Sequence, residues 1–309
     1  MLPFAPMLIR DRLAHKRPVF SFEFFPPKTA EGEDALMRSL ERLAPLEPDF
    51  VSVTWGAGGS TRARTIEIVS RIKQEFGIEA MAHLTCVGST REDLKAVLDQ
   101  LSHAGVHNVL ALRGDPPKGE QTFTATSGGF RHATELVDFV RSRGEFCVGA
   151  ACYPEVHPEA HTAAADLQHL VEKVNAGADF LITQLFFDNQ KFHEFEAAAR
   201  AAGITVPIVA GIMPVTNVSQ VERFSKMCGA TLPEVLRTRL GSVEGDPQEV
   251  FWTGVSYAAH QCRALLRPSA GAPFGKSPAG VPGVHFYTLN KSPAARAIFE
   301  ILRIARVGF

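Results

Sequence analysis

Glu23 is the residue of this chain whose setting most directly predicts chemistry. It lies in the run Val19-Phe-Ser-Phe-Glu-Phe-Phe25, which holds four phenylalanines and no cation and is typical of a buried strand. A buried carboxylate either finds hydrogen-bond donors or has its pKa raised until it holds a proton at neutral pH. Glu23 is therefore a candidate general acid, although an ion pair with an arginine from elsewhere in the fold is equally consistent. Pro26 and Pro27 end the strand, which places Glu23 near its carboxyl end.

Two further stretches combine polar groups with rigid or apolar surroundings. Leu112-Arg-Gly-Asp-Pro-Pro117 offers a guanidinium, a bare backbone and a carboxylate, which together can bind a flat polar ring. An ordinary Gly-Asp-Pro turn with a solvated arginine is the alternative, and for this stretch alone we favour it. Gln184 closes the apolar run that begins at Phe180, and a buried amide needs both donor and acceptor partners. This favours a heterocyclic ligand at Gln184 over a core amide bonded within the protein.

Other patterns are weaker. Gly56–Ser60 superficially matches a dinucleotide-binding loop, but it follows the second expected strand, and the third ends in His-Leu-Thr-Cys instead of an acidic residue. His157 and His161 stand four residues apart, yet Pro158 restricts them to a first helical turn, so we expect no metal site. The cysteines form no Cys-x-x-Cys pair, and we expect them to be reduced core residues: Cys86, Cys147, Cys152, Cys228 and Cys262.

Composition narrows the class of protein. The 309 residues carry 32 Lys and Arg against 33 Asp and Glu, so no basic excess favours nucleic acid. The N-terminus does not read as a signal peptide, and no segment approaches the roughly 18 apolar residues that would span a bilayer. We therefore expect a cytoplasmic protein with no membrane segment and no nucleic-acid partner.

Strand-like runs alternate with stretches of helical period along the whole chain. The last expected strand is preceded by two consecutive helices within 231–267 and a Pro/Gly/Ser-rich loop at 268–283, and Ser89–Glu92 is expected to form a capping box. This pattern favours an α/β fold, a (β/α)8 TIM-type barrel with extra helices before the last strand, in a single domain over 1–309. The expected strands are 19–25, 50–55, 79–85, 107–112, 146–152, 179–184, 207–211 and 284–289.

In such a barrel the active site lies at the carboxyl ends of the strands. Loops are polar in any protein, which explains some of the polar residues found there, but not a glutamate among phenylalanines. The polar residues at or just after the expected strand ends are Glu23, Thr54, His83, Thr85, Arg113, Asp115, Tyr153, His157, Gln184, Gln220 and Tyr287.

Taken together, eight stretches in order along the chain resemble one family, the methylenetetrahydrofolate reductases. Together they leave little room for coincidence, although no single one is decisive. The matching stretches are Ser21–Lys28, Val53–Ser60, Ala82–Cys86, Leu112–Pro117, Ala151–Ala160, Ile182–Asp188, Gly211–Asn217 and His285–Asn290.

The resemblance implies a flavoprotein of one-carbon metabolism and methionine biosynthesis that reduces 5,10-methylenetetrahydrofolate to 5-methyltetrahydrofolate. It implies noncovalent FAD, with NADH or NADPH as the electron donor, and a ping-pong sequence in which nicotinamide leaves before folate binds. Glu23 matches the acid that assists opening of the folate imidazolidine ring. Asp115 matches a residue near the flavin pyrimidine edge and the pterin, and Gln184 one shared by nicotinamide and folate.

The resemblance also assigns binding positions by match to the family motifs. The cofactor positions are Thr54, Trp55, His83, Arg113, Gly114, Asp115, Ala133, Tyr153, His157, Asp166, His169 and Lys173. The substrate positions are Gln184, Gln220, Phe224, Tyr287 and Lys291. Three residues depart from relatives: Lys291 stands where some have arginine, and His169 and Glu172 where some have asparagine and arginine.

Further expectations concern the whole protein. The resemblance predicts no C-terminal regulatory domain, and exposed apolar barrel helices favour a homo-oligomer. Two other classes compete with the reductase: a pterin-binding barrel without redox chemistry, such as a methyltransferase, and a metal-dependent hydrolase.

Overall fold

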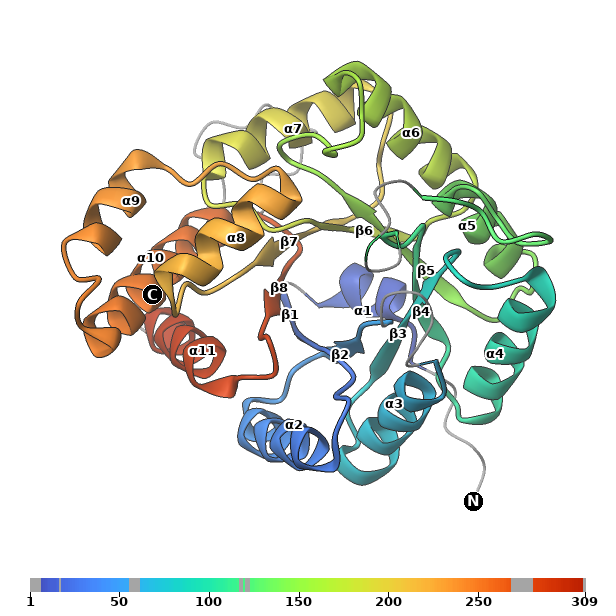
Figure 1. Ribbon diagram of the computed structural model, residues 1–309, viewed down its shortest axis with the longest axis horizontal. Coiled ribbons are helices and arrows are strands. Elements are labelled where there is room, and N and C mark those ends of the chain that lie inside the picture. Colours follow the sequence, from blue (N-terminus) through green and yellow to red (C-terminus); the bar gives the residue numbers. More distant parts are fainter. Residues whose placement is uncertain are drawn as a thin grey trace.

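The computed structural model describes residues 7–16, 18–55, 62–116, 119, 123–267 and 280–307. Within these residues parallel strands form a closed barrel, in which each strand pairs with the next along the chain and β8 returns to β1 (Figure 1). The fold predicted from sequence is confirmed. The strands are β1 Val19–Phe24, β2 Phe50–Val53, β3 Ala80–Thr85, β4 Asn108–Leu112, β5 Cys147–Cys152, β6 Phe180–Thr183, β7 Ile208–Ile212 and β8 Gly283–Tyr287.

Helices surround the barrel, and the two predicted helices before the last strand are present as α9 and α10. The helices after the strands are α2 Ala30–Leu43, α3 Arg62–Phe76, α4 Arg91–His103, α5 Ala133–Arg141, α6 Ala163–Asn175, α7 Asn189–Ala201, α8 Val218–Cys228, α9 Glu234–Gly241, α10 Pro247–Leu266 and α11 Ser292–Val307, with the 3-10 turn η1 Ala44–Leu46 after α2. The glycine stretch Gly56–Ser60 and residues 268–279 of the predicted loop lie outside the described residues. None of the described helices is long and apolar enough to cross a membrane.

The start of α4 differs by one residue from the prediction. Thr90 is the N-cap, its side chain accepts from the backbone N–H of Asp93, and the Asp93 carboxylate accepts from the Thr90 N–H in return. The predicted box at Ser89 and Glu92 is therefore wrong. Ser89 and Thr90 are adjacent hydroxyl residues, each followed three positions later by an acidic residue, so the pattern fits both positions.

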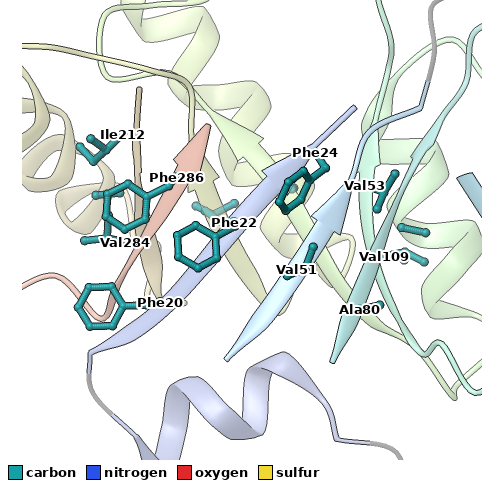
Figure 2. Packing of buried hydrophobic residues seen from close by; sticks show 14 of the residues in the cluster. Phe20, Phe22, Phe24, Val51, Val53, Ala80, Val109, Ile212, Val284 and Phe286 are labelled. Carbon is teal, nitrogen blue, oxygen red and sulfur yellow. The ribbon is translucent and has the colours of Figure 1, made fainter. Parts of the chain in front are cut away.

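Alternate residues of β1 build the packing between strands and helices. Phe20, Phe22 and Phe24 belong to the large cluster that joins the outer faces of the strands to the helices (Figure 2). Phe22 stacks on Phe286 of β8 with ring centroids 5.7 Å apart, and Phe20 meets Phe299 of α11 edge-on. Since these phenylalanines face outward, Ser21 and Glu23 face the barrel interior.

A short helix that the sequence pattern did not reveal, α1 Ile9–His15, precedes the first strand. Ile9 and Leu13 are fully buried and pack with interior residues at the amino-terminal end of the barrel, among them Phe50 and Phe180. The Ile9 N–H donates to Oδ1 of Asn108 at 2.8 Å. This helix closes the end of the barrel opposite the predicted site, in agreement with its place near the barrel axis (Figure 1).

Polar and apolar side chains are unevenly distributed over the barrel interior. On β4, β6 and β7 the inward cluster contains Leu110, Phe180, Ile182 and Val209. On β8, β1, β2 and β3, which also contribute Val19, Phe50 and Met81 to that cluster, the buried polar residues include Ser21, Glu23, Ser52, His83 and His285. This asymmetry concentrates the titratable groups beside Glu23.

Candidate active site

Glu23 lies between two imidazoles. Its side chain is buried, and its Oε2 atom lies 3.4 Å from Nε2 of His83 and 3.4 Å from Nε2 of His285. Its neighbours are therefore two histidines in place of the arginine that the sequence left open; His285 is hydrogen-bonded to it, whereas His83 is in contact without a hydrogen bond. Because β1 is hydrogen-bonded to both β2 and β8, its inward carboxylate is held among the buried polar residues of these strands.

His285 connects Glu23 to two buried hydroxyl groups. Its Nδ1 lies 2.7 Å from Oγ of Ser21, and its Nε2 lies 3.4 Å from Oγ of Ser52. The ring stacks on Phe50 with centroids 5.9 Å apart. His285 is fully buried, so this network fixes its ring out of contact with solvent.

His83 is a neutral imidazole at neutral pH. Burial lowers its pKa to about 4; the negative charge of Glu23 opposes this shift, and His285 adds to it. Nε2 of His83 and Oγ1 of Thr85, which follows on the same face of β3, are buried without a hydrogen-bond partner among the described residues. Buried polar atoms of this kind usually meet a ligand or water, so the carboxyl end of β3 is a candidate binding surface.

Tyr287 closes the interior above His285. Its hydroxyl donates to the carbonyl oxygen of Thr183 at 2.5 Å, and burial raises its pKa well above the usual value. A Cβ atom on Gly211 would lie 2.7 Å from that hydroxyl and 2.2 Å from the Thr183 oxygen. Glycine at 211 is therefore what allows Tyr287 to reach β6.

The stretch after β4 carries Arg113, Gly114 and Asp115. Both terminal nitrogens of the Arg113 guanidinium donate to the carboxylate of Glu159, at 2.6 and 2.7 Å, and the same group lies over the ring of Phe123. Gly114 has φ +85°, and a Cβ there would lie 2.7 Å from Val87, so the turn requires glycine. Arg113 is thus held by Glu159, whereas the sequence left it either solvated or bound to a ligand.

Tyr153 connects Gln184 and Asp115 at the barrel mouth. Burial is the main cause that raises the pKa of Tyr153, and the charge of exposed Asp115 adds to it. Gln184 is half-buried; it makes a side-chain hydrogen bond to Tyr153, and its Oε1 accepts from the N–H of Leu185 at 2.8 Å. The expectation of a fully buried amide is therefore wrong, because Gln184 lies just past the end of β6, where the interior opens.

The loop between β5 and α6 is shaped by an unusual backbone. Val156 has φ +72°, a region that β-branched residues rarely adopt. The next residue, His157, packs against Tyr153 with ring centroids 4.6 Å apart, and its N–H donates to Asp166 at 3.0 Å. Nδ1 of His157 accepts from the N–H of Glu159, so a neutral ring carries its hydrogen on Nε2. This leaves Nε2 as a donor for a ligand.

The other positions that the resemblance assigns to a cofactor lie on α5, on α6 and directly after β2. Ala133 is the first residue of α5, and His169 is exposed on α6. Lys173 of α6 donates to the carbonyl oxygen of Ala151 at 2.6 Å, and burial lowers its pKa. These residues follow β4 and β5, on the same side of the mouth as Arg113 and Tyr153. Thr54 and Trp55, in contrast, are buried directly after β2.

The positions other than Gln184 that the resemblance assigns to the substrate lie on the side of β7 and β8. Gln220 and Phe224 are half-buried on α8, and Lys291 is exposed between β8 and α11. A cavity of about 310 Å³ lies between the two loops after β7 and β8. It is lined by Pro214, Thr216, Asn217, Phe251, Tyr287, Thr288, Leu289, Lys291, Pro293, Ala294 and Ala295.

Sequence reasoning missed three residues of the polar network, Ser21, Ser52 and His285. A signal was present, because residues two apart on a strand share a face. Ser21 precedes Glu23 by two positions, and His285 precedes Tyr287 by two. The alternation along each strand indicates which side chains share a face. Only barrel closure indicates that the inward faces of β1 and β8 are neighbours.

Comparisons with known proteins agree with this arrangement. A family model described as methylenetetrahydrofolate reductase matches residues 8–303. The chain is 39% identical over 286 residues to 5,10-methylenetetrahydrofolate reductase of Pectobacterium carotovorum subsp. carotovorum, covering 92% of this chain and 90% of that protein. It is 39% identical over 290 residues to methylenetetrahydrofolate reductase (NADH) 1 of Arabidopsis thaliana, covering 90% of this chain. The chain spans 47% of that plant protein, about half its length.

Solved structures support the fold at low sequence identity. A Clostridium thermocellum protein that binds two copies of 5-methyl-5,6,7,8-tetrahydrofolic acid matches with a TM-score of 0.64 and 15% identity, covering 98% of this chain and 100% of that one. A likeness at this identity shows the fold alone. The match of the family model over nearly the whole chain, with the bacterial relative of similar length, shows more: the chain belongs to the methylenetetrahydrofolate reductase family.

Proposed function

We propose that this protein reduces 5,10-methylenetetrahydrofolate to 5-methyltetrahydrofolate with noncovalent FAD and electrons from NADH or NADPH. Family membership supports the reaction, and the buried Glu23 between two imidazoles is the observation that carries the mechanism. The C. thermocellum protein of similar fold, which binds a methylated tetrahydrofolate, is consistent with a pterin site on such a barrel.

The described residues fit a flavin. His83 Nε2 and Thr85 Oγ1 supply buried polar atoms without a partner, and His157 offers an Nε2 donor. Arg113 adds a cation on the same side of the mouth, where an anionic part of the cofactor would compete with Glu159. When bound, FAD supplies the hydride that the reduction requires.

Glu23 would act as the general acid towards the folate. Donating a proton to N10 opens the five-membered ring and produces a cation at N5, which then accepts hydride. The chain's contribution is to keep this proton available and out of water: Glu23 is only 6% exposed, and His83 and His285 flank its Oε2. A neutral His83 beside it does not compete as a fixed positive charge. The negative charge of Asp115 would favour the cation from the open side of the mouth.

The cavity after β7 and β8 fits the folate tail. It joins an apolar wall that includes Phe251 and Leu289 to the polar groups of Thr216 and Lys291. An aromatic ring with a carboxylate at its end matches this combination. Lys291 would hold that carboxylate as a point charge, without the paired geometry of an arginine.

Gln184 and Tyr153 would serve a site shared in turn by nicotinamide and folate. Gln184 lies past β6 at the mouth, hydrogen-bonded to Tyr153, and is half-buried. An amide in this place can donate to one ligand and accept from the next without a change of charge. This supports the ping-pong order that the resemblance implies.

The test compares the two half-reactions in wild type and in Glu23→Gln. We expect visible flavin bands in the wild type that bleach with NADH under anaerobic conditions and return when methylenetetrahydrofolate is added. Glu23→Gln keeps the size of the side chain but removes its acid, so we expect it to bleach normally and not to recover. Equal loss of both half-reactions would reject the assigned role. A colourless wild-type protein that binds folate and gains no flavin bands with added FAD would instead favour the pterin-binding barrel without redox chemistry.

A further inference from the structure

The corner between β8 and α11 has an unusual backbone. Leu289 and Asn290 are consecutive residues at positive φ, 51° and 59°. Asparagine adopts this region at little cost, whereas leucine does so only where its surroundings impose it. Interactions made by the corner must therefore hold it in this shape.

The side chain of Asn290 provides the first of these interactions. Its Oδ1 accepts from the N–H of Phe25 at 2.7 Å, and its Nδ2 donates to the carbonyl oxygen of Phe25 at 2.8 Å. The β1–β8 ladder ends at the pair Glu23 and Tyr287. Asn290 thus takes the place of a neighbouring strand for Phe25, two residues past the last paired position.

Thr288 provides the second interaction, at Glu23 itself. Its N–H and its hydroxyl both donate to the carbonyl oxygen of Glu23, at 3.4 and 2.5 Å. The Asn290 N–H donates in turn to the Thr288 hydroxyl oxygen at 3.2 Å. Ser39 of α2 donates to the Asn290 carbonyl oxygen at 3.0 Å and holds the corner from outside.

On the side of β2 the ladder holds β1 as far as Phe24, which pairs with Val53 and whose carbonyl oxygen accepts from the N–H of Thr54 at 2.9 Å. Beyond Phe24, the described hydrogen bonds to the backbone of Phe25 come from Asn290. Phe25 is 40% exposed, so its side chain does not anchor the backbone in the core. Pro26 and Pro27 follow and have no N–H to donate to a neighbouring strand. The backbone that carries the Glu23 carboxylate is therefore fixed on its β8 side by the corner.

We propose that Asn290 is a positioning residue for Glu23: its two hydrogen bonds to Phe25 fix the end of β1 and keep the carboxylate between His83 and His285. Lys291 is the next residue, and its N–H donates to Thr288 at 2.9 Å. The same corner therefore sets the separation between the acid and the cation at the folate tail. This inference rests on the proposed function and extends it to Asn290, which is not among the residues that line the cavity.

Asn290→Gly separates the two roles of Asn290, which are to adopt a positive φ and to form the two hydrogen bonds to Phe25. Glycine adopts φ 59° without strain, so the corner keeps its backbone, but both hydrogen bonds to Phe25 are lost. We expect the folate half-reaction at saturating substrate to slow by about tenfold, because small displacements of a reacting group are costly. Flavin bleaching by NADH is expected to stay close to wild type. Ser39→Ala is the matched control, since it removes a hydrogen bond to the same residue on the side away from β1.

Two further measurements test whether the hydrogen bonds between Asn290 and Phe25 are responsible. Asn290→Asp keeps the acceptor for the Phe25 N–H but places an oxygen against the Phe25 carbonyl, so we expect a defect of the same kind. Hydrogen exchange of the Phe25 amide should be faster in Asn290→Gly, irrespective of which reaction the protein catalyses. Unchanged exchange, equal loss of both half-reactions, or a folate half-reaction as fast as in wild type would each overturn the proposal. Failure of the wild type itself to bleach and recover would instead reject the proposed function.

Discussion

Nε2 of His285 lies 3.4 Å from Oε2 of Glu23, and both side chains are buried in the barrel interior. The two residues lie on strands that pair directly, but in register Glu23 faces Tyr287 and His285 faces Ser21. The contact therefore runs diagonally across the ladder, between neighbouring inward positions. It joins the candidate acid to a ring that is itself bonded to Ser21 at 2.7 Å.

Replacing His285 by phenylalanine tests whether this contact matters for proton delivery. Phenylalanine keeps a flat ring against Phe50 but removes both nitrogens, so Glu23 loses one of its two imidazole neighbours. We expect the folate half-reaction to slow by about tenfold or more, with flavin reduction largely retained. Ser52→Ala removes only the more distant hydroxyl, at 3.4 Å, and should have a smaller effect. A His285→Phe enzyme that reduces folate at the wild-type rate would contradict the prediction.

His83 predicts a specific loss of stability in acid. Its pKa is about 4 in the folded protein and near 6.5 when unfolded, so between these values the unfolded chain binds a proton that the folded chain does not. The free energy of unfolding should therefore fall as pH drops from 6.5 to 4, by at most about 3 kcal/mol from this residue. Denaturant unfolding of wild type and His83→Gln across this range measures the contribution. The difference in the free energy of unfolding between wild type and His83→Gln should change with pH. A difference that stays constant would contradict the predicted contribution of His83.

Gly211 should not tolerate alanine. The added Cβ would meet the Thr183 carbonyl and the Tyr287 hydroxyl at 2.2 and 2.7 Å, and the first of these is backbone that cannot turn aside. We expect the free energy of unfolding to fall by about 1–3 kcal/mol and folate binding to weaken, because Tyr287 loses its place. Thermal unfolding and a folate titration provide the two measurements.

A matched control exists for this substitution at the end of α9. A Cβ on Gly241 would meet nothing within 4 Å, so Gly241→Ala should be neutral or slightly stabilising. Equal melting temperatures for Gly211→Ala and Gly241→Ala would show that the close approach of Tyr287 is not required.

Val156→Gly should separate stability from cofactor binding. Glycine accepts φ 72° freely, which relieves strain of about 1–2 kcal/mol, partly offset by the greater freedom of the unfolded chain. The variant should therefore be as stable as wild type or slightly more so. It should nevertheless bind FAD more weakly, because the backbone before His157 becomes flexible and the His157 side chain is no longer fixed in one orientation.

Glu47→Gly is the control for strain relief alone. Glu47 also has a positive φ, 53°, but is exposed between η1 and β2, at the opposite end of the barrel from the mouth. We expect a similar change in stability and an unchanged dissociation constant for FAD, measured by flavin fluorescence. Weaker FAD binding in Glu47→Gly as well would mean that the effect at Val156 is not local.

Much of the fold could be predicted because its signals are local. Alternation of Phe20, Phe22 and Phe24 with Ser21 and Glu23 defines a strand with one apolar face, and helices with a single apolar stripe follow at regular intervals. The short helix α1 was missed because only Ile9 and Leu13 are fully buried, too few positions to establish a period. The capping box is predicted one residue too early, at Ser89 instead of Thr90, because either of these adjacent hydroxyl residues could cap α4.

The sequence by itself indicated the succession of strands and helices along the chain, the position of Glu23 near the end of β1, and family membership through motifs spread along the chain. The tertiary structure alone decided the partners of that acid. His285 lies 262 residues from Glu23 along the chain, and the two meet because barrel closure pairs β8 with β1. The hydrogen bonds between Asn290 and Phe25, which lie 265 residues apart, also depend on the pairing of β8 with β1. Side-chain period indicates which face a residue occupies, but only closure determines which faces meet.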